Sequence, residues 1–202
     1  MKKSIVILGA GGHGRVVLDI ALLNGYENAI FLDDSDRSDV EVVGKTNEFK
    51  KYIKEYDFFV AIGNNVVRER ITSMLVENNA ELATLVHPSA QIGSNVRLGK
   101  GTVVVAGAVI NTGAVIGEGV IVNTSSSVDH DDVISDYCHI SVGSHLAGNV
   151  SVGKRCFIGA GATVINNVSI CDDCMIGAGA VVVKNVCEKG TYVGVPARKI
   201  MK

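Results

Sequence analysis

The 202-residue sequence has no tryptophan, and its five phenylalanines and five tyrosines make aromatic residues only 5% of the chain. It also has little proline, and no apolar run approaches the roughly 20 residues that cross a bilayer. Its 19 Lys and Arg residues are not clustered and are outnumbered by 21 Asp and Glu, so nothing indicates binding to nucleic acid. A net charge of −2 with 47% hydrophobic residues excludes a disordered chain. We therefore expect a folded protein that binds neither nucleic acid nor membrane.

Small and β-branched residues take the place of the missing aromatics. Val and Ile together number 50, and there are 23 glycines. Because β-branched side chains pack well on pleated strands, this composition favours a β-rich core. The length allows one large domain or two small ones with a real core.

Strand and helix patterns alternate over the first part of the chain. Apolar runs at residues 4–8, 29–32 and 57–62 predict strands, and helical spacing predicts helices at 16–23 and from residue 65 to about 76. This order is typical of a βαβαβ unit with a parallel sheet, and we assign it to a Rossmann-like domain over residues 1–85. The basic start of the chain runs into a glycine-rich loop without a cleavage site, so we interpret it as the first strand of a cytoplasmic protein.

The glycine-rich loop follows the first predicted strand. Gly9, Gly11 and Gly14 fit the G-x-G-x-x-G pattern, and the free N–H groups of such a strand-to-helix turn attract anions. A tight turn without a ligand is the alternative. The unit has about half the length of a full dinucleotide fold, which favours a mononucleotide or a nucleotide sugar over NAD. Asp33 and Asp34 end the second strand, where they could bind a ribose or a base.

From Val86 onward a six-residue repeat replaces this pattern. An aliphatic residue stands at every sixth position as far as Val182, which makes 17 consecutive positions. Small residues such as Ala108 mostly stand four positions later, and glycine often follows the aliphatic residue. Such a period predicts a parallel β-helix, in which each turn buries its surface only against its neighbours. We assign residues 86–202 to this second, all-β domain.

The repeat resembles the left-handed β-helix of the hexapeptide-repeat acyltransferases, in which three hexapeptides make one triangular coil. Cys138, Cys156 and Cys174 are separated by three hexapeptides each and share the inward position, so we expect them to stack as small buried hydrophobic groups. Cys171 and Cys174 form a C-x-x-C motif, but we expect them to point to opposite sides of the wall, which disfavours a metal site. Reduced thiols are consistent with a cytoplasmic location.

A cluster of His and Asp residues lies in the middle of the repeat. His130 is expected at a corner of the coil, between Asp129 and Asp131. A carboxylate that binds one ring nitrogen makes the other nitrogen more basic, as a general base requires. The residues alone leave open a solvated acidic corner without function, and they do not decide which aspartate orients His130.

The whole chain is similar to the sugar acetyltransferases that include the UDP-4-amino-sugar N-acetyltransferases of bacillosamine-type pathways and the sialic acid O-acetyltransferases. The resemblance implies direct transfer of acetyl from acetyl-CoA, with His130 and Asp131 as the catalytic pair and without a metal or bound cofactor. It also implies a homotrimer and a nucleotide-sugar acceptor held by the first domain. The implied substrate-binding residues are Gly11, Gly12, His13, Asp33, Asp34 and Gly63, and the implied acetyl-CoA-binding residues are His139, Gly148 and Ala160.

The resemblance leaves two candidate enzyme functions, and a third candidate is a protein without catalytic activity. The leading one is N-acetylation of a UDP-4-amino-4,6-dideoxy-sugar in surface glycan biosynthesis. The second is O-acetylation of sialic acid or of another sugar hydroxyl, because either acceptor must lose a proton. The third is a non-catalytic β-helical scaffold that binds a nucleotide.

Overall fold

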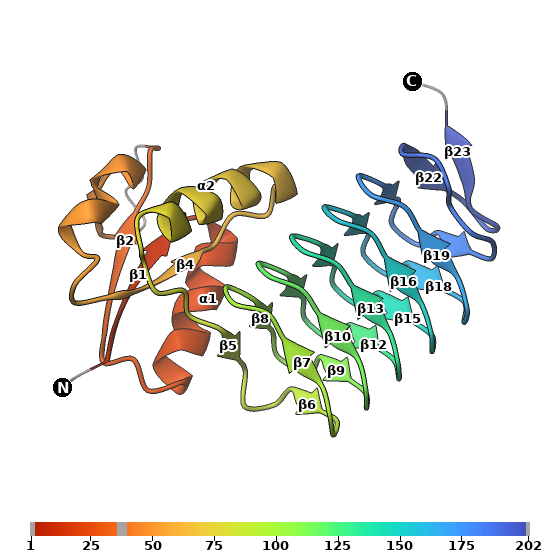
Figure 1. Cartoon of the computed structure of the whole chain (residues 1–202), viewed down its shortest axis with the longest axis horizontal. Coiled ribbons are helices and arrows are strands. Elements are labelled where there is room, and N and C mark those ends of the chain that lie inside the picture. Colours follow the sequence, from red (N-terminus) through yellow and green to blue (C-terminus); the bar gives the residue numbers. More distant parts are fainter. Residues whose placement is uncertain (1–2, 36–39, 201–202) are drawn as a thin grey trace.

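The computed structural model describes residues 3–35 and 40–200. An α/β unit at the N-terminal end leads into a row of stacked coils that ends at the C-terminus (Figure 1). The predicted fold class, a Rossmann-like unit followed by a left-handed parallel β-helix, is confirmed. The division of the chain into two domains between residues 85 and 86 stays a prediction. The first strand of the β-helix spans Leu85–Val86.

The α/β unit contains a parallel sheet in the order β3-β2-β1-β4. Its elements are β1 (Ser4–Leu8), α1 (Gly12–Leu23), β2 (Asn28–Leu32), β3 (Val42–Gly44), the 3₁₀ helix η1 (Thr46–Lys51), β4 (Asp57–Val60) and α2 (Asn65–Glu77). The expected alternation differs in one connection, where β3 and η1 join β2 to β4 in place of an α-helix. The chain order reverses between β1 and β4, and ligands of open α/β sheets bind beside such a reversal.

The β-helix has three faces, each built from strands of two residues. The face toward the α/β unit, here called the seam face, contains β5 (Leu85–Val86), β8 (Val103–Val104), β11 (Ile121–Val122), β14 (His139–Ile140), β17 (Phe157–Ile158) and β20 (Met175–Ile176), followed by β22 (Thr191–Val193) and β23 (Arg198–Ile200). The second face contains β6 (Gln91–Ile92), β9 (Val109–Ile110), β12 (Ser127–Val128), β15 (His145–Leu146), β18 (Thr163–Val164) and β21 (Val181–Val182). The third face contains β7 (Arg97–Leu98), β10 (Val115–Ile116), β13 (Val133–Ile134), β16 (Ser151–Val152) and β19 (Ser169–Ile170).

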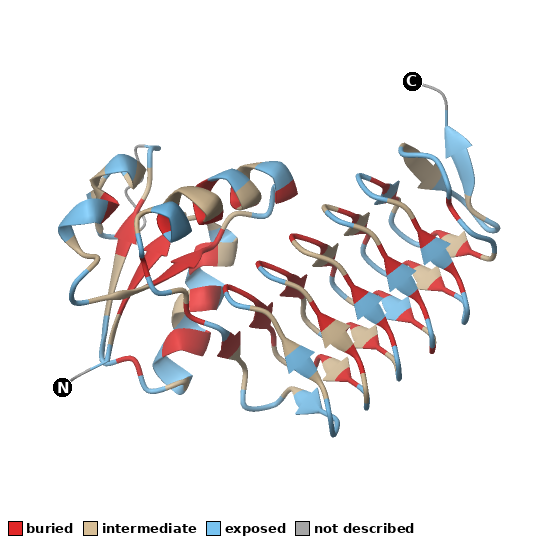
Figure 2. Cartoon of the chain, in the orientation of Figure 1, coloured by how far each residue is buried: buried red, intermediate tan, exposed pale blue. Residues whose placement is uncertain are grey.

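Successive coils pair in register with a spacing of three hexapeptides, so that Ser127 pairs with His145 and His145 with Thr163. The second residue of each short strand points inward, and most of these aliphatic side chains are fully buried. Figure 2 shows the buried residues inside the coils and in the central sheet of the α/β unit. The aliphatic residue of each hexapeptide therefore forms the core that the repeat predicts.

The corners of the coils explain why the repeat is rich in glycine. The residue three positions after each aliphatic residue has a positive φ at 15 consecutive corners, from Asn95 to Gly179. Glycine adopts this left-handed conformation without strain, and Asn and Asp tolerate it better than other residues. Most of the 15 corner residues are Gly, Asn or Asp, and Tyr137 and Arg155 are exceptions on the corner nearest α2.

The cysteine ladder is confirmed, because Cys138, Cys156 and Cys174 are all buried in the core of the β-helix. The predicted opposite orientation of Cys171 and Cys174 is wrong, since their sulfur atoms lie 3.6 Å apart. The two cysteines are the first and fourth residues of a corner, and a tight turn brings such residues together. All five cysteines are free thiols.

One buried cation joins α2 to the β-helix. The Arg68 side chain is 1% exposed, and its guanidinium donates hydrogen bonds to the carbonyl oxygens of Gly119 (2.7 Å), Tyr137 (2.8 Å) and Ile62 (2.9 Å). Its Nη2 also donates to the side-chain oxygen of Asn65 at 2.9 Å. Burial lowers the pKa of Arg68 to about 10, so it remains charged at neutral pH. Partial negative charges of carbonyl groups surround this cation.

We expect Arg68→Met to destabilise the protein by roughly 3 to 5 kcal/mol, because it leaves several buried carbonyl groups without donors. The measurement is the free energy of unfolding in urea. Arg70→Met, an exposed position on the same helix, is the control and should change stability by less than about 0.5 kcal/mol. Equal effects of the two substitutions would contradict the role of Arg68 at this junction.

Candidate functional site

His130 lies at the corner between β12 and β13, where the second and third faces of the β-helix meet. Its Nδ1 lies 2.9 Å from Oδ2 of Asp131, and both side chains are more than half exposed. This hydrogen bond, followed by the negative charges of the neighbouring aspartates, raises the pKa of His130. The structure therefore identifies Asp131 as the aspartate that contacts the ring, while Asp129 accepts the backbone N–H of His130.

Gly148 lies directly beside the His130 ring, one coil further along. A Cβ atom at Gly148 would stand 2.5 Å from Nε2 of His130, so only glycine leaves room for the ring here. With Nδ1 donating to Asp131, the lone pair of Nε2 is available for a proton. Among the described residues, no group accepts a hydrogen bond from the Gly148 N–H. A proton acceptor on an exposed side chain and an N–H group without an acceptor among the described residues thus lie close together.

The predicted nucleotide-binding residues lie along the edge of the sheet where β1, β2 and β4 end. Gly11 and Gly12 begin α1, and the N-cap Gly11 has no side chain to occupy the first N–H groups of the helix. The Asp33 carboxylate accepts the N–H of Ala10 at 2.6 Å and therefore ties the glycine-rich loop to the end of β2. Asp34 accepts a hydrogen bond from the N–H of Thr46 at 2.9 Å.

Two buried histidines meet where the glycine-rich loop approaches the seam face. Burial, together with the positive charge of Arg68, lowers the pKa values of His13 and His139 to about 4. Nε2 of His139 lies 3.0 Å from the side-chain nitrogen of Asn123. Nε2 of His13 is buried without a hydrogen-bond partner among the described residues. A hydrogen bond to the backbone of Gly63 acts against the lowering of the pKa of His139. Because buried polar atoms are nearly always paired, the unpaired ring nitrogen of His13 indicates a site for a ligand.

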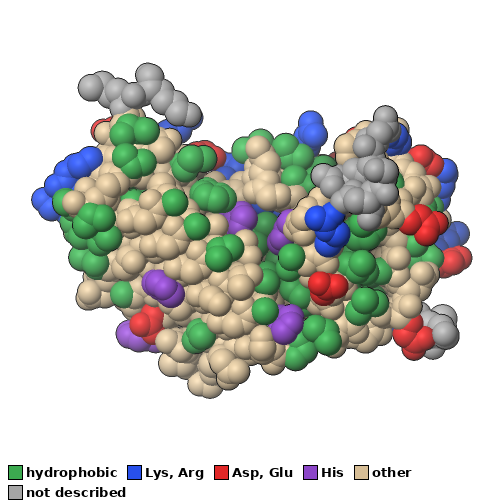
Figure 3. Space-filling view, turned by 180° about the vertical axis from the view of Figure 1, so that it is seen from behind, with side chains coloured by type: hydrophobic (Ala, Val, Ile, Leu, Met, Phe, Trp, Pro, Cys, Tyr) green, Lys and Arg blue, Asp and Glu red, His purple; other side chains and the backbone are tan. Residues whose placement is uncertain are grey.

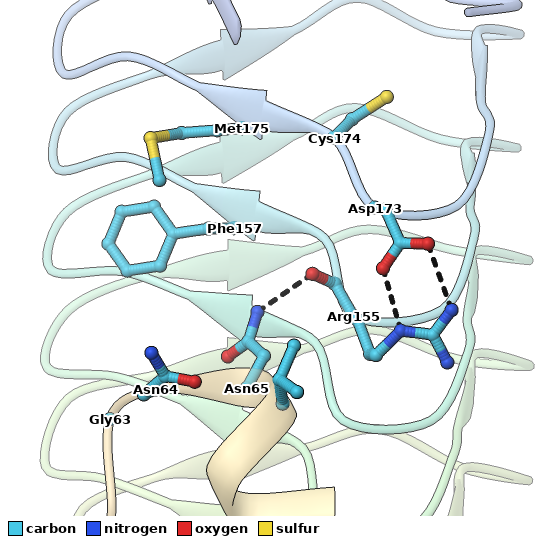
Figure 4. A pocket seen from close by; sticks show the side chains of 9 residues that line it. Gly63, Asn64, Asn65, Arg155, Phe157, Asp173, Cys174 and Met175 are labelled. Atoms are coloured by element: carbon cyan, nitrogen blue, oxygen red, sulfur yellow. Dashed lines mark hydrogen bonds and ion pairs between the residues drawn. The ribbon is translucent and has the colours of Figure 1, made fainter. Parts of the chain in front are cut away.

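A pocket of about 390 Å³ lies beside this place, between the start of α2 and the seam face. Figure 4 shows the side chains of Phe157 and Met175 along one side of it, with Arg155 held on the other by Asp173. Figure 3 shows histidine and hydrophobic side chains in a hollow between the two parts of the molecule. The pocket is lined by Gly63, Asn64, Asn65, Val66, Arg155, Phe157, Asp173, Cys174 and Met175.

The predicted residues lie at three separate places in this chain. His139 lies on the seam face beside His13, so the structure brings together residues that were predicted to bind different ligands. His130 and Gly148 lie at the opposite corner of the triangular coil, where the second and third faces meet. Ala160 lies at a third place, the corner between β17 and β18. A single copy of this chain therefore does not bring all of the predicted site residues together.

Sequence reasoning missed three residues of these sites. Arg68 reaches the carbonyl oxygen of Gly119 only because α2 packs against the β-helix, and Asn123 reaches His139 only because successive coils stack. No local motif marks either residue. Asp132 was recognisable, because it is the only carboxyl at the inward positions between Ala90 and Ala180. Within residues 3–35 and 40–200, no group of three or more His, Cys, Asp or Glu side chains is arranged to hold a metal ion. Over the same residues, no helix has the length and apolarity of a membrane span.

The buried histidines predict a loss of stability in acid. His139 binds a proton near pH 6.5 in the unfolded chain but only near pH 4 in the folded protein. The unfolded state is therefore favoured by protonation as the pH falls. The stability that neutral His139 provides above pH 6.5 is lost as the pH falls toward 4. Between pH 7 and 4.5 we expect the His139→Gln variant to lose about 2 kcal/mol less stability than the wild type. Urea unfolding at both pH values measures this difference. His145→Gln, at an exposed histidine, is the control, and an equal effect there would contradict the prediction.

Three known families match separate parts of the chain. The PglD N-terminal domain family matches residues 4–75, and the bacterial transferase hexapeptide family matches residues 84–128. The family described as the hexapeptide repeat of succinyl-transferase matches residues 149–184.

Individual relatives extend this similarity. The UDP-N-acetylbacillosamine N-acetyltransferase of Bacillus subtilis is 36% identical over 116 residues, which are 52% of this chain and 52% of that protein. The chain thus spans about half the length of this curated relative. The acetyltransferase domain of PglB from Neisseria gonorrhoeae, solved with acetyl coenzyme A, is 36% identical with a TM-score of 0.95 and covers 99% of this chain and 100% of its own. PerB from Caulobacter crescentus, solved with CoA and GDP-perosamine, is 38% identical with a TM-score of 0.91, over 98% of this chain and 97% of its own.

The resemblance noted in the sequence is therefore confirmed at the level of the family. Both solved structures align with nearly the whole chain, and the α/β unit and the coils match the corresponding families separately. The protein belongs to the PglD-like family of hexapeptide-repeat sugar acetyltransferases.

Proposed function

We propose that this protein transfers the acetyl group of acetyl-CoA to the amine of a nucleotide-linked amino sugar, of the UDP-4-amino-4,6-dideoxy-sugar type, in surface glycan biosynthesis. The observation that carries the proposal is the 2.9 Å contact between His130 Nδ1 and Asp131 at an exposed corner, with Nε2 next to Gly148. The names of the relatives support it, since PglB was solved with acetyl coenzyme A and PerB with CoA and GDP-perosamine.

The chemistry follows from this geometry. Nε2 of His130 removes a proton from the amine while the nitrogen bonds to the thioester carbonyl carbon. Asp131 orients the ring and stabilises the imidazolium, and the Gly148 N–H donates to the carbonyl oxygen as it becomes negative, an interaction typically worth about 3 to 4 kcal/mol. The carbon–sulfur bond then breaks, and the imidazolium returns the proton to the leaving thiolate of CoA. The amide and free CoA are the products.

The transfer is direct, without an acyl-enzyme intermediate. A cysteine nucleophile requires an accessible thiol with a lowered pKa. Burial raises the pKa of Cys174 to about 12, and Cys138 and Cys156 are buried with it in the core of the β-helix. The free thiols of this chain support a cytoplasmic location, where nucleotide sugars and acetyl-CoA are both available.

The α/β unit binds the nucleotide of the acceptor. The residues that we assign to it share the edge of the sheet at the start of α1, where N–H groups and the helix dipole favour phosphate. The unpaired Nε2 of His13 is available to the same ligand. The assigned residues are Gly11, Gly12, His13, Asp33, Asp34 and Gly63.

The active protein is a homotrimer in which neighbouring protomers complete each site. The nucleotide-binding edge faces the seam, whereas His130 lies at the opposite corner of the coil, so the acceptor bound to one protomer must meet His130 of another. Val133 and Ile165, close to the His130 corner, are 44% and 38% exposed, as expected of side chains that a second copy covers. Acetyl-CoA then lies between adjacent β-helices, in contact with His139, Gly148 and Ala160.

Two substitutions test the catalytic pair. His130→Ala should lower kcat by about 10²- to 10⁴-fold with little change in stability, since the side chain is exposed. Asp131→Asn tolerates the positive φ of 61° but removes the charge, so it should lower kcat and also shift the acidic limb of the pH profile to lower pH. The sign follows because the Asp131 hydrogen bond raises the pKa of His130, which must be neutral to accept a proton.

The assay is acetyl transfer to UDP-4-amino-sugars, with GDP-linked amino sugars and free or CMP-linked sialic acid measured in parallel. If the protein acetylates a sugar hydroxyl and no amine, O-acetylation replaces N-acetylation as the function. Near wild-type activity of the His130→Ala variant would contradict the assignment of the general base.

Mixed trimers test whether the site is shared. Gly12→Glu has open space for its side chain and places a negative charge at the start of α1, so it should fold and repel a nucleotide. Trimers of Gly12→Glu alone or of His130→Ala alone should be inactive. In a random equal mixture, about one quarter of the interfaces join an intact nucleotide site of one protomer to an intact His130 of the next. The mixture should therefore recover about one quarter of wild-type activity. Mixed trimers without recovered activity would show that the site is not shared in this way.

A further inference from the structure

Asp132 is a third carboxylate beside His130, and it points into the wall of the β-helix. Its exposed fraction is 0%, whereas Asp131 next to it is mostly exposed. It occupies the inward position that Ala, Val, Ser, Thr or Cys fills in the other hexapeptides from residue 86 to residue 182. Burial of a carboxylate costs free energy unless hydrogen bonds compensate, so its presence at this position requires an explanation.

The two oxygens of Asp132 connect the His130 corner to the next coil. Oδ2 accepts the N–H of Asp129 at 2.9 Å, and Oδ1 accepts the N–H of Val150 at 2.7 Å. The N–H of Asn149 donates to the backbone oxygen of His130 at 3.0 Å, close to the same place. These bonds hold the segment that carries His130 in register with the segment that carries Gly148.

A neutral side chain performs the same structural task elsewhere in the β-helix. The Thr102 hydroxyl, at the same inward position, accepts the N–H of Val120 at 3.0 Å and is equally buried. Cys138 and Cys156 occupy later inward positions and make sulfur hydrogen bonds to carbonyl groups. A carboxylate is therefore not needed to build a coil, and its charge points to a role connected with His130.

The charged groups around Asp132 all belong to its own corner. They are Asp129, His130 and Asp131, while the coils before and after contribute only uncharged side chains at this corner, such as Thr112 and Asn149. Burial raises the pKa of Asp132 to about 7, against the two backbone hydrogen bonds, which favour the charged form. The negative charge of Asp132 also contributes to the raised pKa of His130.

We propose that Asp132 is a positioning residue for acetyl transfer, which holds the His130 corner in register with Gly148 and stabilises the imidazolium from inside the wall. The inference rests on the proposed role of His130 as general base. It extends that role by adding a buried carboxylate that does not touch the substrate.

Two variants separate the hydrogen bonds from the charge. Asp132→Cys matches the neighbouring inward cysteines in size, and it should lower kcat about tenfold with the KM for acetyl-CoA within about twofold. Asp132→Asn keeps one oxygen acceptor and loses the charge, so its kcat should fall less. Both variants should shift the acidic limb of the kcat–pH profile to lower pH, because they lower the pKa of His130.

Thr102→Cys is the matched control. It removes an equivalent acceptor at an equivalent inward position on a different corner, between β7 and β8, so it should lower the free energy of unfolding but leave kcat and the pH profile unchanged. A wild-type kcat and pH profile in Asp132→Cys, or in Asp132→Asn if the cysteine variant does not fold, would overturn the inference. Persistent activity of His130→Ala would instead overturn the proposed general base, so the two failures are distinguishable.

Discussion

The stacking of one coil on the next, with every third hexapeptide in register, is the constraint on which the rest of the structure depends. Backbone pairing such as Ser127 with His145 allows no slip, because a shifted register would move aliphatic side chains out of the core. The same register places Gly148 against the ring of His130 and Val150 against the carboxylate of Asp132. A repeat that builds the core therefore also brings together the groups that we propose for catalysis.

The junction at Arg68 determines what this scaffold can do. By joining α2 to the carbonyl groups of the seam face, it places the glycine-rich loop against one side of the coil. The His130 corner lies on the opposite side, where the second and third faces meet. Because of this separation we propose that a neighbouring protomer completes the site, since the two halves of one chain do not face each other.

Different surroundings shift the pKa values of His130 and His139 in opposite directions, although both belong to the β-helix. His130 is exposed beside carboxylates, which raise its pKa and keep its ring in a defined orientation. His139 is buried near the positive charge of Arg68, which lowers its pKa to about 4 and keeps it neutral. A neutral imidazole suits ligand binding, whereas a basic imidazole with an exposed nitrogen suits proton transfer.

The sequence by itself determined the repeat, the inward aliphatic residues, the glycine-rich loop and the pairing of His130 with a neighbouring aspartate, because each depends on local spacing. Only the tertiary structure decided that Asp131 holds the ring, that Cys171 approaches Cys174, and that His139 joins His13. Arg68 could not be assigned beforehand, because its partners are carbonyl groups of distant segments. Asp132 stands out in the sequence as a carboxyl at an inward position, but only the structure shows that it accepts the N–H of Val150 in the next coil. Contacts between side chains and a distant backbone leave no pattern in the sequence, whereas periodic burial does.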